Sequence, residues 1–185
     1  MNERINTPIS MAELERRWTA IRAAMKEAKV DVLIAQANND FVGGYVKYLT
    51  DMPATNGYLY TVIFPADGEI SAVAQGPFGQ DQRFDKLEAT PRRGVQRLMG
   101  TPAYSSVHYA STYDAECALK ALEKYQGATI GLLAPGSLSY GFVNHLQKNM
   151  TKATFIDATP LVDPIKAVKS AEELALIRRM AALQD

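Results

Sequence analysis

Three arginines close together in the chain are the most evident candidates for binding chemistry. Arg92, Arg93 and Arg97 lie among glycines and prolines. A guanidinium group binds carboxylates and phosphates through paired hydrogen bonds, so the cluster is a candidate site for an acidic ligand or an acidic protein surface. A solvated basic face is the simpler interpretation of the same residues, and the pattern alone leaves both open.

A polar loop is the second candidate. Residues 51–57 separate two apolar segments and are followed at once by an aromatic residue. Loops between strands often carry binding residues. The side chains here that could contact a ligand are Thr55, Asn56 and Tyr58. A plain connection between two strands is the alternative interpretation.

Residues that usually perform catalysis or bind metals are few. Metal sites need clustered ligands, but His108 and His145 stand far apart and outside any Asp-x-Asp or Glu-x-x-His pattern. Cys117 lies in a helical pattern of small and apolar residues, which favours a buried, inert thiol. Asp31 lacks the acidic partners that a ribonuclease-H-like carboxylate cluster would require. No phosphate-binding glycine loop occurs, so the sequence predicts no catalytic residue and no metal ligand.

Charge and composition narrow the class of protein. The chain carries 20 basic and 20 acidic residues and has a formal net charge of zero. A neutral chain has no field to attract a phosphate backbone, which argues against nucleic acid as a partner. No apolar run approaches the roughly 20 residues of a membrane span. The single cysteine excludes an intrachain disulfide and suits a reducing compartment, so we expect a cytoplasmic protein without a membrane partner.

The elements that would position these residues alternate along the chain. Ser10 and Glu13 form a capping-box pattern at the start of a helix that ends near Ala28. Strands are predicted at 30–35, 43–50, 58–64, 69–75, 105–110, 128–134 and 153–156, helices at 113–125, 137–148 and from 170 onwards, a mixture of loop and helix at 76–101, and a short helical turn at 157–162 before Pro164. This alternation predicts an α/β fold, with a mixed β-sheet flanked by helices.

The last helix is predicted from a second capping box, Ser170 and Glu173. Apolar residues follow at helical spacing, among them Leu174, Ile177 and Met180. The chain then stops at Asp185 without a cap or a tail. We therefore expect this helix to be an interrupted one, at the front of a longer protein.

The C-terminal segment resembles a known junction. Residues 157–162 read D-x-x-P-L-V and residues 165–173 read I-x-x-x-K-S-x-x-E, and both are similar to the sequence before the catalytic domain in the prolidase, aminopeptidase P and creatinase family. Residues 45–51, Y-x-x-Y-L-T-D, resemble the family's N-x-x-Y-L-T-G, and residues 64–69 match its usual hairpin.

The resemblance implies a creatinase-type N-terminal domain, with a ribonuclease-H-like mixed sheet, over residues 1–168. It implies that residues 169–185 are a linker and the first helix of a missing catalytic domain. The family's ligands for two divalent metal ions (Mn, Co or Zn), which are two Asp, one His and two Glu, lie in that catalytic domain, and none maps onto this chain. The implied function is that of the non-catalytic front domain of an Xaa-Pro dipeptidase or aminopeptidase-like metallohydrolase.

The resemblance also implies partners. In the family, the N-terminal domain helps to form a homodimer and lends a loop to the partner subunit's substrate pocket. The corresponding loop here is residues 51–58. It has Ala54, Thr55 and Asn56 where creatinase has an aromatic residue and an Arg, so a small proline-type peptide is a better candidate substrate than creatine. The alternative hypothesis is a free-standing binding module that holds an acidic ligand or protein through the three arginines.

Overall fold

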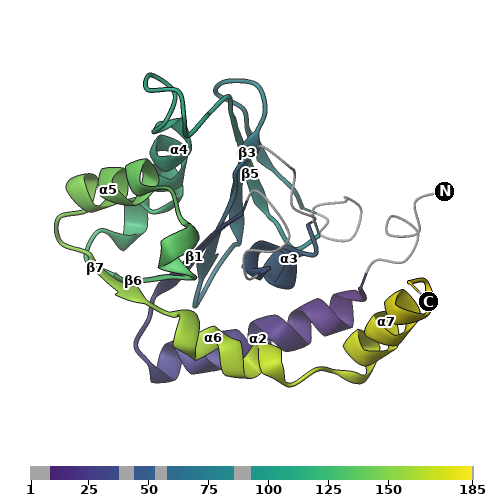
Figure 1. Ribbon diagram of the computed structural model, residues 1–185. Helices are drawn as coiled ribbons and strands as arrows, with labels where there is room; N and C mark the ends of the chain where they lie inside the picture. Colours follow the sequence, from purple (N-terminus) through teal and green to yellow (C-terminus); the bar gives the residue numbers. More distant parts are fainter. Residues whose placement is uncertain (1–8, 38–43, 53–57, 86–92, 185) are drawn as a thin grey trace.

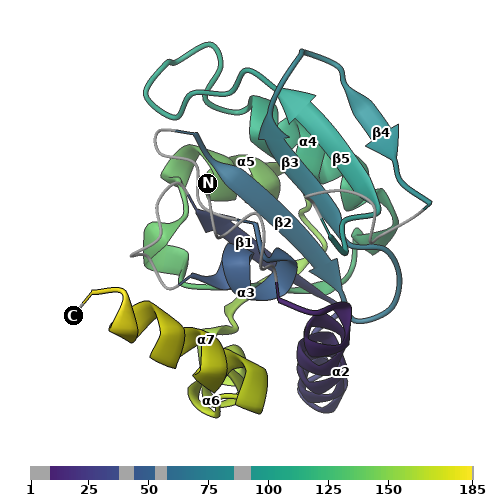
Figure 2. The same cartoon turned by 90° about the vertical axis from the view of Figure 1, so that its right-hand side faces the viewer.

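The computed structural model describes residues 9–37, 44–52, 58–85 and 93–184. These residues form one seven-stranded sheet with helices on both faces (Figures 1 and 2). The strands are β1 (Val32–Ala37), β2 (Tyr60–Pro65), β3 (Ser71–Gln75), β4 (Asp81–Arg83), β5 (Arg97–Thr101), β6 (Thr129–Leu132) and β7 (Thr154–Asp157), in the spatial order β4-β5-β3-β2-β1-β6-β7. The predicted mixed sheet flanked by helices is confirmed.

The sheet is mixed because hairpin and crossover connections both occur. β1 pairs antiparallel with β2, β2 with β3, and β4 with β5. β3 pairs parallel with β5, β1 with β6, and β6 with β7. Every residue of β1 and β2 is buried, as expected for central strands that are covered on both faces. The apolar runs in these strands therefore supply the centre of the fold.

Two groups of helices cover the two faces (Figure 1). One face packs against α2 (Met11–Glu27), α3 (Tyr45–Thr50) and α6 (Thr159–Ala167), and the other against α4 (Tyr113–Ala121) and α5 (Tyr140–Asn149). Neighbouring residues of β1 point to opposite faces, since Leu33 joins the first core and Ile34 the second. None of the helices in the described part of the chain has the length and apolar character that crossing a membrane requires.

Only one of the two hydrogen bonds predicted for the first capping box is present. The Ser10 hydroxyl accepts a hydrogen bond from the Glu13 amide at 3.1 Å. The Glu13 carboxylate does not accept the second bond, from the Ser10 amide, because it binds Arg16 and Arg17. The Ser10 amide instead donates to Glu172 at 2.6 Å, at the start of α7 (Ala171–Ala182). The box of α7 itself, Ser170 with Glu173, is confirmed.

The predicted strand at residues 43–50 is wrong, because Tyr45–Thr50 forms the short helix α3. Tyr45, Tyr48 and Leu49 are spaced three and four residues apart, and all are buried against the first core. That spacing suits one helical face as well as it suits a short apolar strand. Packing on the sheet decides between the two.

Three further predictions need correction. The described part of residues 76–101 contains strands β4 and β5 and no helix. Residues 105–110 form turns, so His108 does not lie on a strand. Helix α6 continues through Pro164 to Ala167. Proline removes one helical hydrogen bond, but the helix places Val162 in the first core, and its neighbours Leu161 and Ile165 pack there too.

Gly94 allows a close contact between the loop before β5 and helix α2. Its φ is +78°, and an added Cβ would lie 2.3 Å from the Trp18 ring. We expect Gly94→Ala to lower the free energy of unfolding by about 2 to 3 kcal/mol, because it combines a strained backbone with overpacking. Gly44→Ala is the control, since Gly44 has φ +62° and nothing within 4 Å of an added Cβ. Equal losses in denaturant titrations of the two variants would contradict this account.

Candidate functional site

The two described members of the predicted arginine cluster, Arg93 and Arg97, pair with different carboxylates. Arg93 lies near α3 and the start of α2, where it donates to the Asp51 carboxylate at 2.6 Å and also to the carbonyl of Ile9. Arg97 lies on β5 and holds Asp81 through two hydrogen bonds of 2.9 and 2.7 Å. Arg92 lies outside the described residues. The acidic-ligand hypothesis therefore gains no support from a shared arginine site.

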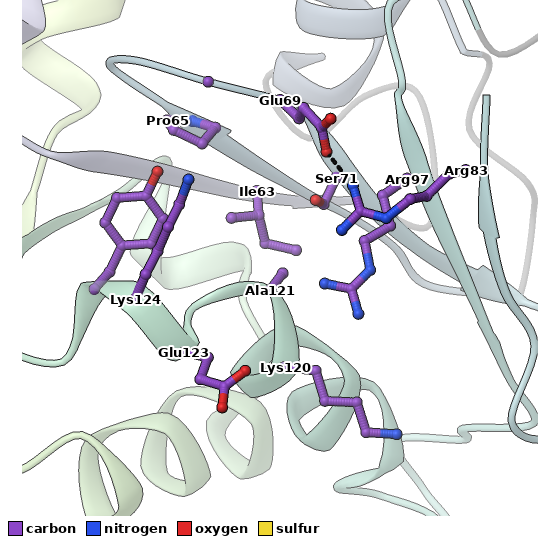
Figure 3. Close-up of a pocket in the computed structure, with 12 residues that line it drawn as sticks. Ile63, Pro65, Glu69, Ser71, Arg83, Arg97, Lys120, Ala121, Glu123 and Lys124 are labelled. Atoms are coloured by element: carbon purple, nitrogen blue, oxygen red, sulfur yellow. Dashed lines mark hydrogen bonds and ion pairs between the residues drawn. The ribbon is translucent and has the colours of Figure 1, made fainter. Parts of the chain in front are cut away.

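Arg97 does line a groove on the surface (Figure 3). The groove has a volume of roughly 560 Å³ and lies between the sheet and the end of α4. Arg83 and Arg97 reach it from the sheet, while Lys120 and Lys124 reach it from the helical side. Its floor includes the buried residues Ile63 and Ser71. The volume is in the range of small-molecule sites.

The charges in this groove largely cancel. Arg83 pairs with Glu69 at 2.5 Å, and Arg97 pairs with Asp81 at 2.7 Å. The hydrogen bond from Arg97 lowers the pKa of the Asp81 carboxyl, so this pair stays ionised at neutral pH. Glu123 lies beside the two lysines. The groove could therefore hold an anion only weakly.

Of the three side chains predicted to contact a substrate, Tyr58 is described, whereas Thr55 and Asn56 lie outside the described residues. Its ring packs edge-to-face on Tyr104 with centroids 5.6 Å apart. The Gln75 amide donates to the Tyr104 hydroxyl at 3.2 Å. Tyr58 therefore belongs to an aromatic group at the end of the sheet where β3 and β5 terminate.

The described residues that the sequence analysis considered for catalysis or metal binding do not form a shared site. Among the described residues, no group of three or more His, Cys, Asp or Glu side chains is placed to hold a metal ion. Cys117 is half-buried, and burial raises the pKa of its thiol, which makes it a poor nucleophile. Asp31 accepts a hydrogen bond from the Thr129 amide at 2.7 Å, which ties β1 to β6. Its role in the fold is structural.

A buried polar network was missed at the sequence level. The Gln36 side chain donates to Thr61 at 2.9 Å and to Asp114 at 3.0 Å, and it accepts from the Ser139 amide at 3.1 Å. Burial raises the pKa of Asp114 to about 6, although hydrogen bonds partly oppose it. The network joins β1, β2, α4 and α5. An Asp one residue into a predicted helix gave no sign that it would be buried.

A second network attaches α7 to α2. The Arg17 guanidinium donates to Glu13 and to Glu173, at 2.8 Å in each case, and all three side chains are largely buried. Hydrogen bonds from Arg16 lower the pKa of Glu13 to about 2 against the opposing effect of burial, and Arg17 adds to this lowering. The stabilisation from Glu13 is therefore present above about pH 4.5 and is lost as the pH falls towards 2. The first turn of α7 is held firmly.

Beyond that first turn, Leu176 packs partly against the first core, but α7 leaves a second apolar stripe uncovered. No residue of α7 is buried. Leu174, Ile177, Met180 and Leu183 are between 38% and 62% exposed. Figure 1 shows the helix extending from the body of the molecule towards the C-terminus. An anchored helix with a bare apolar stripe needs a further surface to cover it.

The described residues form an α/β domain, with a mixed seven-stranded sheet between two groups of helices. A family model for the creatinase/prolidase N-terminal domain matches residues 17–168. The chain belongs to this family. No curated protein sequence matches it.

Solved structures share the fold at low identity. Aminopeptidase P from Streptococcus thermophilus is 16% identical with a TM-score of 0.56, over 83% of this chain and 98% of that one. A prolidase from Thermococcus sibiricus is 15% identical with a TM-score of 0.62, over 90% of this chain but 40% of that one. The N-terminal domain of the cytoplasmic peptidase PepQ from Mycobacterium tuberculosis H37Rv is 14% identical with a TM-score of 0.53, over 80% and 97%. The chain thus spans less than half of the prolidase.

Proposed function

We propose that this chain is the non-catalytic N-terminal domain of a metal-dependent hydrolase of the Xaa-Pro dipeptidase or aminopeptidase type. Membership of the creatinase/prolidase N-terminal family carries the proposal. The two divalent ions (Mn, Co or Zn) of such an enzyme would be held by a separate catalytic domain. A cytoplasmic location is supported by the structural similarity to the N-terminal domain of the cytoplasmic peptidase PepQ.

We propose a domain boundary just before α7. Residues 1–168 form the N-terminal domain, and residues 169–185 form the linker and the first helix of the catalytic domain. The uncovered apolar side of α7 supports this division, since the catalytic domain would bury Ile177 and Met180. The network around Arg17 and Glu173 fixes the direction in which the chain leaves the first domain.

The domain acts through its partners. It contributes to a homodimer, and its loop with Thr55, Asn56 and Tyr58 reaches the substrate pocket of the partner subunit, where a small peptide binds. The contact between Tyr58 and Tyr104 supports this role, because it holds one end of the loop against the end of the sheet.

An activity assay on the 185-residue chain tests the proposal. With Mn²⁺, Co²⁺ or Zn²⁺ added, we expect no hydrolysis of Xaa-Pro dipeptides above the rate without protein, and no stoichiometric metal binding by calorimetry. A two-domain prolidase assayed in parallel is the positive control. Metal-dependent hydrolysis that saturates with substrate, and that follows the chain through purification, would contradict the proposal.

A further inference from the structure

A row of paired residues crosses the sheet along one wall of the groove in Figure 3. Ile63 of β2 pairs with Ser71 of β3. Arg97 of β5 pairs with Ser71 on one side and with Arg83 of β4 on the other. Side chains that pair across neighbouring strands share a face of the sheet and lie close enough to contact one ligand. All four line the groove, and we call this row the sheet wall.

The Ser71 hydroxyl is an unused hydrogen-bonding group in the sheet wall. Ser71 is only 7% exposed, and its side chain has no hydrogen-bond partner among the residues that the structure describes. It points to the face of the sheet that α4 covers, as does Val73 two residues further along β3. A largely buried hydroxyl normally has a partner, because burying it without one costs free energy. A group bound in the groove would supply that partner.

Arg97 also has donors to spare. Its Nε and Nη2 atoms donate to Asp81, which uses two of the five N–H groups of the guanidinium. Its Nη1 atom makes no hydrogen bond within the described part of the chain. Figure 3 shows the side chain extending from the sheet towards α4. A carboxylate beside Ser71 could therefore accept from both residues without breaking the pair between Arg97 and Asp81.

The opposite wall of the groove carries charges of both signs. Lys120, Glu123 and Lys124 reach it from the helical side (Figure 3). None of the three forms an ion pair with another described residue, whereas Arg83 and Arg97 are both paired with acids. A paired charge must part from its partner to meet a ligand fully, and an unpaired charge need not. The helical wall thus offers a cation and an anion that are both available.

We propose that this groove binds a small zwitterion, a molecule with one carboxylate and one ammonium group, such as a free amino acid. The carboxylate lies beside Ser71, Arg97 and Lys120. The ammonium group lies beside Glu123. A bare anion would also meet the acidic side chains of the groove, and a bare cation would meet its four basic ones. A ligand with both charges suits this pattern best.

The size and the apolar part of the groove agree with this class of ligand. A volume of roughly 560 Å³ accommodates an amino acid, and Ile63, Pro65 and Ala121 offer contact to an apolar side chain. Water competes for the exposed charges, which makes each ion pair weak. We therefore expect a dissociation constant on the order of 1 mM. The inference concerns residues of this chain alone and does not depend on the proposed metallohydrolase.

Titration of the isotope-labelled chain with L-leucine, followed by amide NMR, tests the proposal. We expect saturating shifts at the amides of Ser71, Arg97 and Ala121, with a dissociation constant on the order of 1 mM. Two analogues each remove one charge, since N-acetyl-L-leucine lacks the ammonium group and L-leucinamide lacks the carboxylate. Each should bind about fivefold more weakly than L-leucine.

Two variants locate the ligand in the groove. Ser71→Ala should weaken the binding of L-leucine about tenfold, because it removes a hydrogen bond to a charged group. Its thermal midpoint should stay near that of the wild type, since the hydroxyl bonds to no described residue. Lys120→Met should weaken binding about fivefold. The control is Lys148→Met on α5, an exposed lysine outside the groove, which should leave the affinity unchanged.

Four results would overturn the proposal. The first is a titration without saturating shifts at the groove amides. The second is N-acetyl-L-leucine binding as tightly as L-leucine, which would mean that any anion suffices. The others are an unchanged affinity in Ser71→Ala, and a loss in Lys148→Met that equals the loss in Lys120→Met.

Discussion

Arg17→Met is expected to lower the free energy of unfolding by about 3 to 5 kcal/mol. Arg17 is 5% exposed. Its guanidinium binds the carboxylates of Glu13 and Glu173, donates to the Tyr48 carbonyl at 3.2 Å, and lies 4.4 Å above the Tyr48 ring. Methionine fills much of the same volume but leaves two largely buried carboxylates without this cation. Arg16, which is more exposed, is then left to balance both carboxylates, at 2.8 Å from Glu13 and 3.5 Å from Glu173, and the large loss follows from this incomplete compensation.

Chemical denaturation of the variant measures this loss, and Arg178→Met is the matched control. Arg178 lies on the same junction helix but is exposed and makes no ion pair with the described residues. Its replacement should change stability by no more than about 0.5 kcal/mol. A loss below about 1 kcal/mol for Arg17→Met would mean that the junction is held by apolar packing and not by this network.

Asp114→Asn is expected to gain about 3 kcal/mol of stability relative to the wild type as the pH rises from about 4 to about 7. Burial raises the pKa of Asp114 from 3.8 to about 6 in the folded chain. The folded state therefore binds a proton that the unfolded state releases. This contribution is fully present below pH 3.8 and is lost as the pH rises through 6.

Comparing the pH dependence of stability of Asp114→Asn with that of the wild type isolates the contribution of the Asp114 carboxyl. Gln36, Thr61 and Ser139, which share its network, carry no charge. Asparagine cannot accept all the hydrogen bonds of the carboxylate, but that constant loss does not change with pH. The exposed neighbour Glu116, on the same helix, provides the control variant Glu116→Gln, which should keep the wild-type pH dependence. The raised pKa of Asp114 would be contradicted if the free energies of unfolding of Asp114→Asn and the wild type changed with pH in parallel.

Much of the fold was predictable from the sequence because the strongest signals are local. The apolar, β-branched runs at β1, β2 and β6 became central strands, and the Ser170–Glu173 capping box opened α7 as predicted. The errors fall where local patterns are ambiguous. Residues 45–50 suit a strand or a helical turn equally well, and only contact with the sheet selects the helix.

The site was less predictable because its features depend on contacts between distant residues. Arg93 and Arg97 are close in sequence, but separate partners, Asp51 and Asp81, hold them apart. The Ser10 amide at the start of α2 donates its hydrogen bond to Glu172, which lies more than 160 residues further along the chain. The spacing of residues along the chain does not predict such long-range contacts.

The most direct test of the central claim is to read the source gene past codon 185. The account predicts that the frame continues for roughly the length of another domain, about 200 residues, and encodes two Asp, one His and two Glu in the order of the family's metal ligands. A stop codon directly after Asp185 would contradict it. The chain would then share the fold of these enzymes without their chemistry, and α7 would need a different partner.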